Sequence, residues 1–176
     1  MIYKTCDNIY ERRDKVIDHR HKKFIELSEQ RMTRIFQTAN LIANLSNTTN
    51  YLYSKEEINE LFIVYFNEGK TIKECFSNNI YQPKEDNLNF KFSVPAIEGN
   101  KKNERFRKLA EQRLNKILQN LVLISRLSNK RNYKYSIEEI DYMFSCYMEK
   151  GEEIKMFFEP HLLSLNDTFS YDSFRI

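Results

Sequence analysis

The sequence predicts an all-α protein in which two tandem helical hairpins form a four-helix bundle with a pseudo-two-fold axis. The chain repeats itself: residues 24–77 align without a gap with residues 106–159 at a shift of 82, and 25 of the 54 positions are identical. Apolar residues recur at helical spacing in both copies. Gly and Pro, three of each in 176 residues, are as scarce as a mainly helical protein requires. One hairpin cannot bury both faces of its helices, whereas two related hairpins can.

The first half of each copy is expected to be one long helix. The apolar phase predicts a helix from about Asn8 to Leu45, with a counterpart from about Asn103 to Leu127. Each is expected to end at a Ser-Asn pair, at 46–47 and 128–129, because Asn tolerates the left-handed conformation that ends many helices.

The second half of each copy begins with a strong helix-start signal. Ser54 and Ser136 are each followed three residues later by a glutamate, Glu57 and Glu139, which is the pattern of a capping box. The repeated turn Leu-Ser-Asn-x-x-Asn-Tyr-x-Tyr-Ser-x-Glu-Glu-Ile is therefore evidence of architecture.

A glycine lies on the apolar stripe of each second helix. Gly69 and Gly151 continue the helical phase, although glycine costs about 1 kcal/mol of helix propensity relative to Ala, so each is expected to allow close approach of a bulky group. Reflecting each hairpin about its turn brings Arg31 opposite Gly69 and Arg113 opposite Gly151. We therefore predict an Arg-over-Gly contact within each hairpin, with the guanidinium directed towards an acid.

The segments after the two hairpins alternate between apolar and polar residues, which is typical of strands. Short β segments are expected near 87–94 and 168–176, where they could pair with each other or remain available to a partner chain. The sequence accordingly divides into an N-terminal extension with the first hairpin, a linker, the second hairpin and a tail, at 1–78, 79–102, 103–160 and 161–176.

The net charge of +3 conceals a strong segregation. Residues 101–134 hold eleven Lys/Arg against two acids, whereas residues 135–176 hold three against nine. Residues 1–35 hold nine against six and residues 36–100 five against eight, so the first helix of each hairpin is basic and the second acidic. One interpretation is internal charge balance between neighbouring helices. The other is a basic surface for phosphates.

The second interpretation depends on where the two copies differ. Thr48 and Thr49 of the first turn are replaced by Lys130 and Arg131 in the second. Together with the basic residues of the first helices, these are the candidate residues for binding nucleic acid or a partner: Lys101, Lys102, Arg105, Lys108, Lys116, Lys130, Arg131, Arg12, Arg13, Arg20, Lys22 and Lys23.

No catalytic, cofactor or metal signature is predicted, and we expect a non-enzymatic protein. His19, His21 and His161 lack supporting ligands at suitable spacing, and three widely spaced cysteines indicate free thiols in a reducing, cytoplasmic setting. No apolar run is long enough to cross a membrane. The segment from Arg13 to His19 resembles the Arg-x(4–6)-His signature of HEPN-type ribonucleases, which implies RNA cleavage as a further alternative.

The repeated turn, Leu45 to Ile58 and Leu127 to Ile140, resembles a module of small uncharacterised proteins from phages, plasmids and AT-rich plastid genomes. The resemblance carries no activity. It implies a protein of a mobile element that binds nucleic acid or a nucleoprotein complex through the basic first helices. The alternative is a protein-only adaptor or inhibitor, for example of a host nuclease or defence complex. Either protein is expected to be a monomer or a homodimer.

Overall fold

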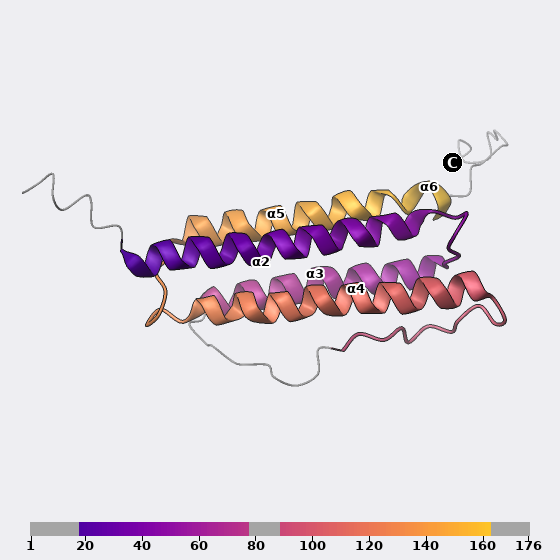
Figure 1. Ribbon diagram of the computed structural model, residues 1–176, viewed down its shortest axis with the longest axis horizontal. Coiled ribbons are helices and arrows are strands. Elements are labelled where there is room, and N and C mark those ends of the chain that lie inside the picture. Colours follow the sequence, from indigo (N-terminus) through magenta and orange to yellow (C-terminus); the bar gives the residue numbers. More distant parts are fainter. Residues whose placement is uncertain (1–17, 78–88, 163–176) are drawn as a thin grey trace, which may run out of the picture.

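The computed structural model describes residues 18–77 and 89–162, which form a bundle of four long helices (Figure 1). This confirms the predicted all-α four-helix bundle. Residues 8–17 of the predicted first helix and the predicted β segment at 168–176 lie outside the described residues. The long helices are α2 (His19–Ala43), α3 (Lys55–Ser77), α4 (Lys101–Ser125) and α5 (Ile137–Met156), and the short helix α6 (Glu159–Leu162) follows α5.

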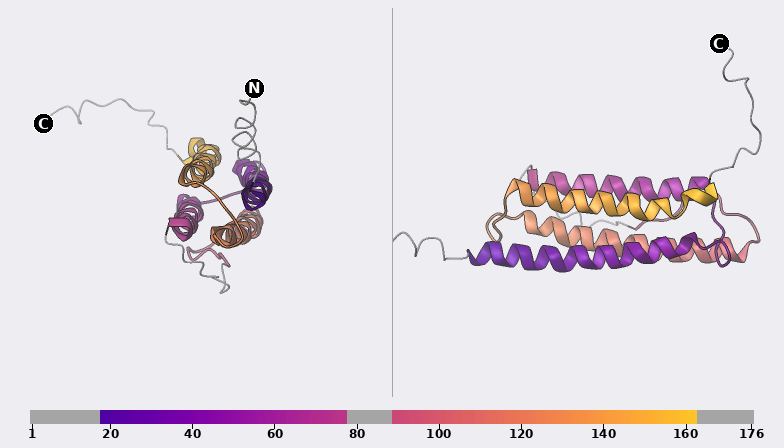
Figure 2. Two further views of the ribbon diagram at one scale, coloured as in Figure 1. Left: turned by 90° about the vertical axis from the view of Figure 1, so that its left-hand side faces the viewer. Right: turned by 90° about the horizontal axis from the view of Figure 1, so that it is seen from above.

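The two helices of each hairpin lie across a diagonal of the bundle, as the end view in Figure 2 shows. α2 packs on α4 and α5, and α3 packs on the same two helices. α2 and α4 run antiparallel to each other, as do α3 and α5 (Figure 1). Each long helix therefore finds its neighbours in the other copy of the repeat.

The pseudo-two-fold axis passes through a stacked pair of buried tyrosines. The rings of Tyr65 (α3) and Tyr147 (α5) lie 4.4 Å apart with an interplanar angle of 3°. The hydroxyl of Tyr65 donates to the carbonyl of Tyr147 at 3.1 Å, and the hydroxyl of Tyr147 donates to the carbonyl of Tyr65 at 2.8 Å. Burial raises the pKa of both hydroxyls, so they remain neutral donors.

The two helical glycines make room for this pair, so the predicted Arg-over-Gly contact is wrong. A Cβ on Gly69 would meet the ring of Tyr147, with its Cδ1 at 2.8 Å, and a Cβ on Gly151 would meet Tyr65 Cε1 at 2.5 Å. The prediction assumed that the two helices of a hairpin lie side by side, whereas α2 and α3 do not. The bulky group opposite each glycine comes from the other hairpin.

The predicted arginines instead join α2 to α4 across the two-fold axis. Arg31 Nη1 donates to the carbonyl of Leu123, and Arg113 Nη1 donates to the carbonyl of Leu41 at 2.6 Å. The partner of each guanidinium is a carbonyl near the end of the opposite helix, and the expected acid is not its partner.

Both capping boxes are confirmed. The N–H of Glu57 donates to Ser54 Oγ at 3.1 Å and the Glu57 carboxylate accepts from the N–H of Ser54 at 2.8 Å, and Ser136 and Glu139 make the same pair of bonds at the same distances.

The preceding helix ends differ from the prediction. The residue that follows each terminal 3₁₀ turn, Asn47 or Asn129, has an extended backbone with φ of −67° or −69°. Neither asparagine therefore adopts the left-handed conformation. Each side chain instead accepts from an N–H two residues further on, at Thr49 and Arg131.

Residues 89–94, here called the strap, lie along the groove between α3 and α4. Phe90 and Phe92 are buried while Lys91 and Ser93 are exposed, so the alternation was correctly predicted. The predicted β segment near 87–94 is nevertheless wrong, since none of the described residues forms a strand. An extended segment needs partners for its backbone, and here side chains of the two helices supply them.

Four side chains of α3 and α4 hold the strap. Asn115 accepts from the N–H of Phe90 at 2.6 Å and donates to its carbonyl at 3.0 Å. Glu111 accepts from the N–H of Phe92 at 3.2 Å. The remaining bonds are made by Glu60, which accepts from the N–H of Ser93 at 2.8 Å and of Val94 at 3.2 Å, and by Arg107, which donates to the carbonyl of Val94 at 3.0 Å.

Gly69→Ala should destabilise the bundle even though alanine is the better helix former. We expect a net loss of about 1–2 kcal/mol of unfolding free energy, because the added methyl overpacks a buried ring and this outweighs about 1 kcal/mol of gained helix propensity. Gly151→Ala should behave alike. Chemical denaturation measures the loss, with Asn67→Ala at an exposed position of α3 as the control. Stabilisation by Gly69→Ala would contradict the observed packing.

Protonation of Glu60 at low pH should weaken the attachment of the strap. Burial alone would raise the pKa of this carboxyl, but the hydrogen bonds from Ser93 and Val94 outweigh burial, so its pKa is lowered. A lowered folded-state pKa gives stability that is present above the unfolded-state pKa and is lost as the pH falls through the folded-state value. Glu60→Gln should therefore remove part of the stability at neutral pH and flatten its loss below about pH 4.5. Denaturation of both proteins from pH 3 to 7 tests this; parallel curves would contradict it.

Candidate nucleic-acid interface

The diagonal arrangement sorts the charge of the protein into two layers. α2 carries five Lys/Arg against two Glu, and α4 carries seven against two. α3 carries three Lys against five Glu, and α5 carries two Lys against six acids. Because α2 pairs with α4 and α3 pairs with α5, one layer of the bundle is basic and the other is acidic.

The outer surface of the basic layer, here called the α2/α4 face, carries cations in pairs related by the two-fold axis. With 3.6 residues per turn, these cations share one side of their helices with Gln30, Gln37, Gln112 and Gln119, and no Asp or Glu occupies that side. The pairs are Lys23 and Arg105, Arg31 and Arg113, and Arg34 and Lys116.

The centre of this face is a shallow groove between α2 and α4. Arg34 and Lys116 line it together with Gln37 and Gln119. Arg34 and Lys116 are exposed and form no ion pair with any of the described residues. Two cations are therefore held open to solvent where an anion could reach both.

Arg31 and Arg113 flank the groove and are half-buried. Burial lowers the pKa of both guanidinium groups, and the positive charges of Arg126 and Arg34 lower that of Arg31 further. An arginine remains protonated in proteins even so. Like charges thus accumulate on this face, and an approaching polyanion would relieve their repulsion.

Ion pairs with the acidic helices do not neutralise the cations of the α2/α4 face. Among the described residues, two contacts between a basic and an acidic side chain connect a first helix to a second helix: Arg107 with Glu57 at 2.8 Å and His21 with Glu139 at 2.7 Å. Neither uses a cation of this face. The acids of α3 and α5 lie in the opposite layer.

The two ends of the bundle divide the predicted basic residues. Lys101, Lys102 and Arg105 lie where α4 begins, and Lys130 and Arg131 lie in the turn after α4 ends (Figure 1). A helix of this length spans about 37 Å, so these groups do not meet. Lys116 lies between them, whereas Arg12 and Arg13 are outside the described residues.

Several predicted residues have local partners. The guanidinium of Arg105 lies 5.8 Å from the ring centre of Tyr51, and the ammonium of Lys23 lies 5.7 Å from that of Tyr133 at the equivalent position. Lys130 lies 5.8 Å from the ring of Tyr135. These tyrosines pack partly against the core, so they position cations at each end of the face.

Other predicted residues lie away from the face. Arg20 pairs with Asp18 at 3.3 Å at the start of α2. Lys108 lies beside the strap, in a hollow that Lys91 and Glu111 also line. Lys22 borders the side of α2 that turns towards α5, next to Glu26 and Glu29.

The sequence interpretation missed Arg34 as a site residue and treated Arg31 and Arg113 as structural residues alone. The signal was present, because Arg31 recurs as Arg113 and Arg34 recurs as Lys116 across the repeat. Its meaning depended on knowing that α2 and α4 are neighbours. That neighbourhood brings equivalent residues of both copies to one surface.

One histidine, His21, contacts the capping box at a helix start. His21 Nε2 lies 2.7 Å from Glu139 in the second capping box, at the place that Asn103 takes beside Glu57 in the first. Burial alone would raise the pKa of Glu139, but its bonds to Ser136 and His21 lower it. His19 is exposed, and the described part of the chain contains no group of three residues able to hold a metal ion.

The fold and the face define a pseudo-symmetric all-α bundle with one cationic layer. Comparison with models of protein families, with curated proteins and with solved structures finds no match to this chain. Within the ranges 18–77 and 89–162, no helix combines the length and apolar character needed to cross a bilayer.

The exposed and the half-buried cations of the face should differ in their effect on stability. Arg34→Ala with Lys116→Ala should leave the unfolding free energy within about 0.5 kcal/mol, because both side chains are exposed and the change reduces repulsion. Arg31→Ala with Arg113→Ala should cost about 1 kcal/mol or more, because two carbonyls lose their charged donors. Denaturation of both double variants checks this, and equal losses would contradict the assignment of Arg34 and Lys116 as free cations.

Proposed function

We propose that this protein binds the phosphate backbone of double-stranded nucleic acid through the α2/α4 face. The observation that supports the proposal is the set of paired cations on α2 and α4, centred on Arg34 and Lys116 and free of acids on the same side. A surface of this kind gains affinity by releasing the counterions condensed on a polyanion.

The symmetry of the face favours a duplex as the ligand. A duplex has two-fold axes perpendicular to its length, and proteins with two-fold symmetry bind it by aligning their axis with one of these. The cations of α2 and α4 are related in the same way, so one strand would meet the residues of α2 and the other strand those of α4.

The face provides little for reading bases. Its side chains between the cations are glutamines and leucines lying along two antiparallel helices, and neither helix projects as a single recognition element. Contacts with phosphates position a protein without conveying sequence. Binding should therefore depend strongly on salt and weakly on sequence.

Charge reversal at the centre of the face tests the proposal. Fluorescence anisotropy with a duplex of mixed sequence, at several salt concentrations, should show that Arg34→Glu with Lys116→Glu weakens binding about tenfold or more at low salt and lowers the slope of log affinity against log salt by about two. The matched control is Lys55→Glu with Lys70→Glu, which makes the same change in net charge at exposed positions of α3.

The control should lose much less affinity than the variant of the α2/α4 face. Equal losses would show a response to net charge alone and would overturn the assignment of the surface. The absence of duplex binding by the unmodified protein at low salt would overturn the proposed function. It would then favour a protein partner, for which the acidic α3/α5 layer offers the exposed apolar residues Ile63 and Met156.

A further inference from the structure

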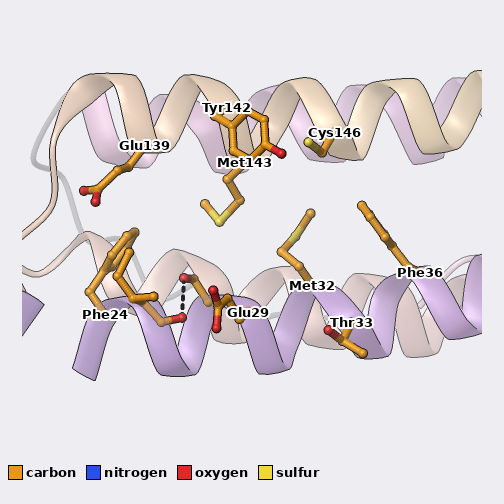
Figure 3. Close-up of a pocket in the computed structure, with 11 residues that line it drawn as sticks. Phe24, Glu29, Met32, Thr33, Phe36, Glu139, Tyr142, Met143 and Cys146 are labelled. Atoms are coloured by element: carbon orange, nitrogen blue, oxygen red, sulfur yellow. Dashed lines mark hydrogen bonds between the residues drawn. The ribbon is translucent and has the colours of Figure 1, made fainter. Parts of the chain in front are cut away.

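A second surface, the groove between α2 and α5, is open and largely apolar. Figure 3 shows Met32 and Phe36 of α2 directed across it towards Met143 and Cys146 of α5. Its volume is about 580 Å³, and Tyr142 on its rim is 74% exposed. Covering such side chains with an apolar segment is favourable, because it removes their apolar surface from water.

The pseudo-two-fold axis relates this groove to the one that the strap fills. The axis exchanges α2 with α4 and α5 with α3, so the groove between α2 and α5 is the counterpart of that between α3 and α4. On the α3/α4 side, Phe92 lies against Phe106 with ring centres 6.0 Å apart and carries Arg107 over its ring at 4.9 Å.

The correspondence holds residue by residue. Five side chains hold the strap through hydrogen bonds, four of them directly and one through Arg107. At a shift of 82, the counterparts of all five line the open groove. These counterparts are Thr33 for Asn115, Glu29 for Glu111, Tyr142 for Glu60, Ile25 for Arg107 and Glu139 for Glu57.

The sequence also contains a counterpart of the strap. At the same shift of 82, Phe174 aligns with Phe92 and Ile176 aligns with Val94, while Asp172 stands in place of Phe90. Residues 163–176 follow α6, and fourteen extended residues reach about 46 Å. The distance back along α5 from Leu162 to Tyr142 is about 30 Å, so the segment is long enough.

We propose that residues 171–176 dock in the groove between α2 and α5, as the strap docks between α3 and α4. Phe174 and Ile176 fill the space beside Phe24 and Met143, and Glu29 accepts the N–H of Phe174 as Glu111 accepts that of Phe92. The segment runs antiparallel to α2, as the strap runs antiparallel to α4. The site therefore takes an extended peptide with the pattern Phe-x-Ile.

The open groove is less polar than its counterpart. Ile25 and Tyr142 replace Arg107 and Glu60, which between them bond four backbone groups of the strap. Fewer hydrogen bonds hold the docked segment, so its docking depends more on the burial of Phe174 and Ile176 and is weaker than that of the strap.

Methionine methyl groups offer a direct test in the full chain. Met32 and Met143 line the groove, whereas Met148 and Met156 lie outside it. In the ¹³C-methyl spectrum, Phe174→Ser with Ile176→Ser should move the signals of Met32 and Met143, because they lose a neighbouring aromatic ring, and should leave those of Met148 and Met156 in place.

The control variant is Phe169→Ser, which removes an aromatic residue of the same tail that has no counterpart in the strap. It should leave the Met32 and Met143 signals unchanged. If Phe174→Ser with Ile176→Ser moves neither signal, or if Phe169→Ser moves both as far, the proposal is overturned. A change in these signals on dilution would assign the groove to the tail of a second copy and would also overturn docking within one chain.

Thiol chemistry provides an independent measurement. In a protein with Cys6→Ser and Cys75→Ser, Cys146 is the remaining cysteine and lies in the groove. Its alkylation should be several-fold faster after Phe174→Ser with Ile176→Ser than before, and an unchanged rate would count against the covered groove.

Discussion

The stacked tyrosines at the two-fold axis are the contact from which the rest of the bundle follows. The two rings lie 4.4 Å apart, and the hydroxyl of each tyrosine donates to the backbone carbonyl of the other. This arrangement requires α3 and α5 to approach closely where the two tyrosines face each other. That approach is possible because Gly69 and Gly151 have no side chain. With α3 and α5 fixed as neighbours, the diagonal leaves α2 and α4 to pair with each other on the opposite side.

The local features of the fold could be predicted from the sequence, whereas its neighbour relations could not. The helices, the capping boxes and the helical glycines follow from interactions between residues close together in the chain. The partner of Gly69 does not, because the same hairpin pattern fits helices lying side by side or across a diagonal. Arg31 was assigned to the wrong partner for this reason. Knowledge of the axis corrects both contacts at once.

The candidate site shows the same division. Charge counts along the chain correctly separated basic first helices from acidic second helices, but a count along the chain has no information about layers. Lys101 and Lys130 looked like parts of one surface, although the length of α4 separates them. Arg34 and Lys116 lie opposite each other in the structure. The alternation of the strap was likewise readable, but its hydrogen-bond partners were distant side chains such as Asn115 and Glu111.

The diagonal arrangement also has an evolutionary meaning. Helices from a single copy of the repeat make their principal contacts with the other copy, so one copy alone has almost no core to bury. A single-copy ancestor could reach this architecture only as a symmetric homodimer, with the two halves later joined by the strap-bearing connection. The two halves of one chain need not be identical, and here one groove carries polar side chains that bond the strap while its counterpart is largely apolar.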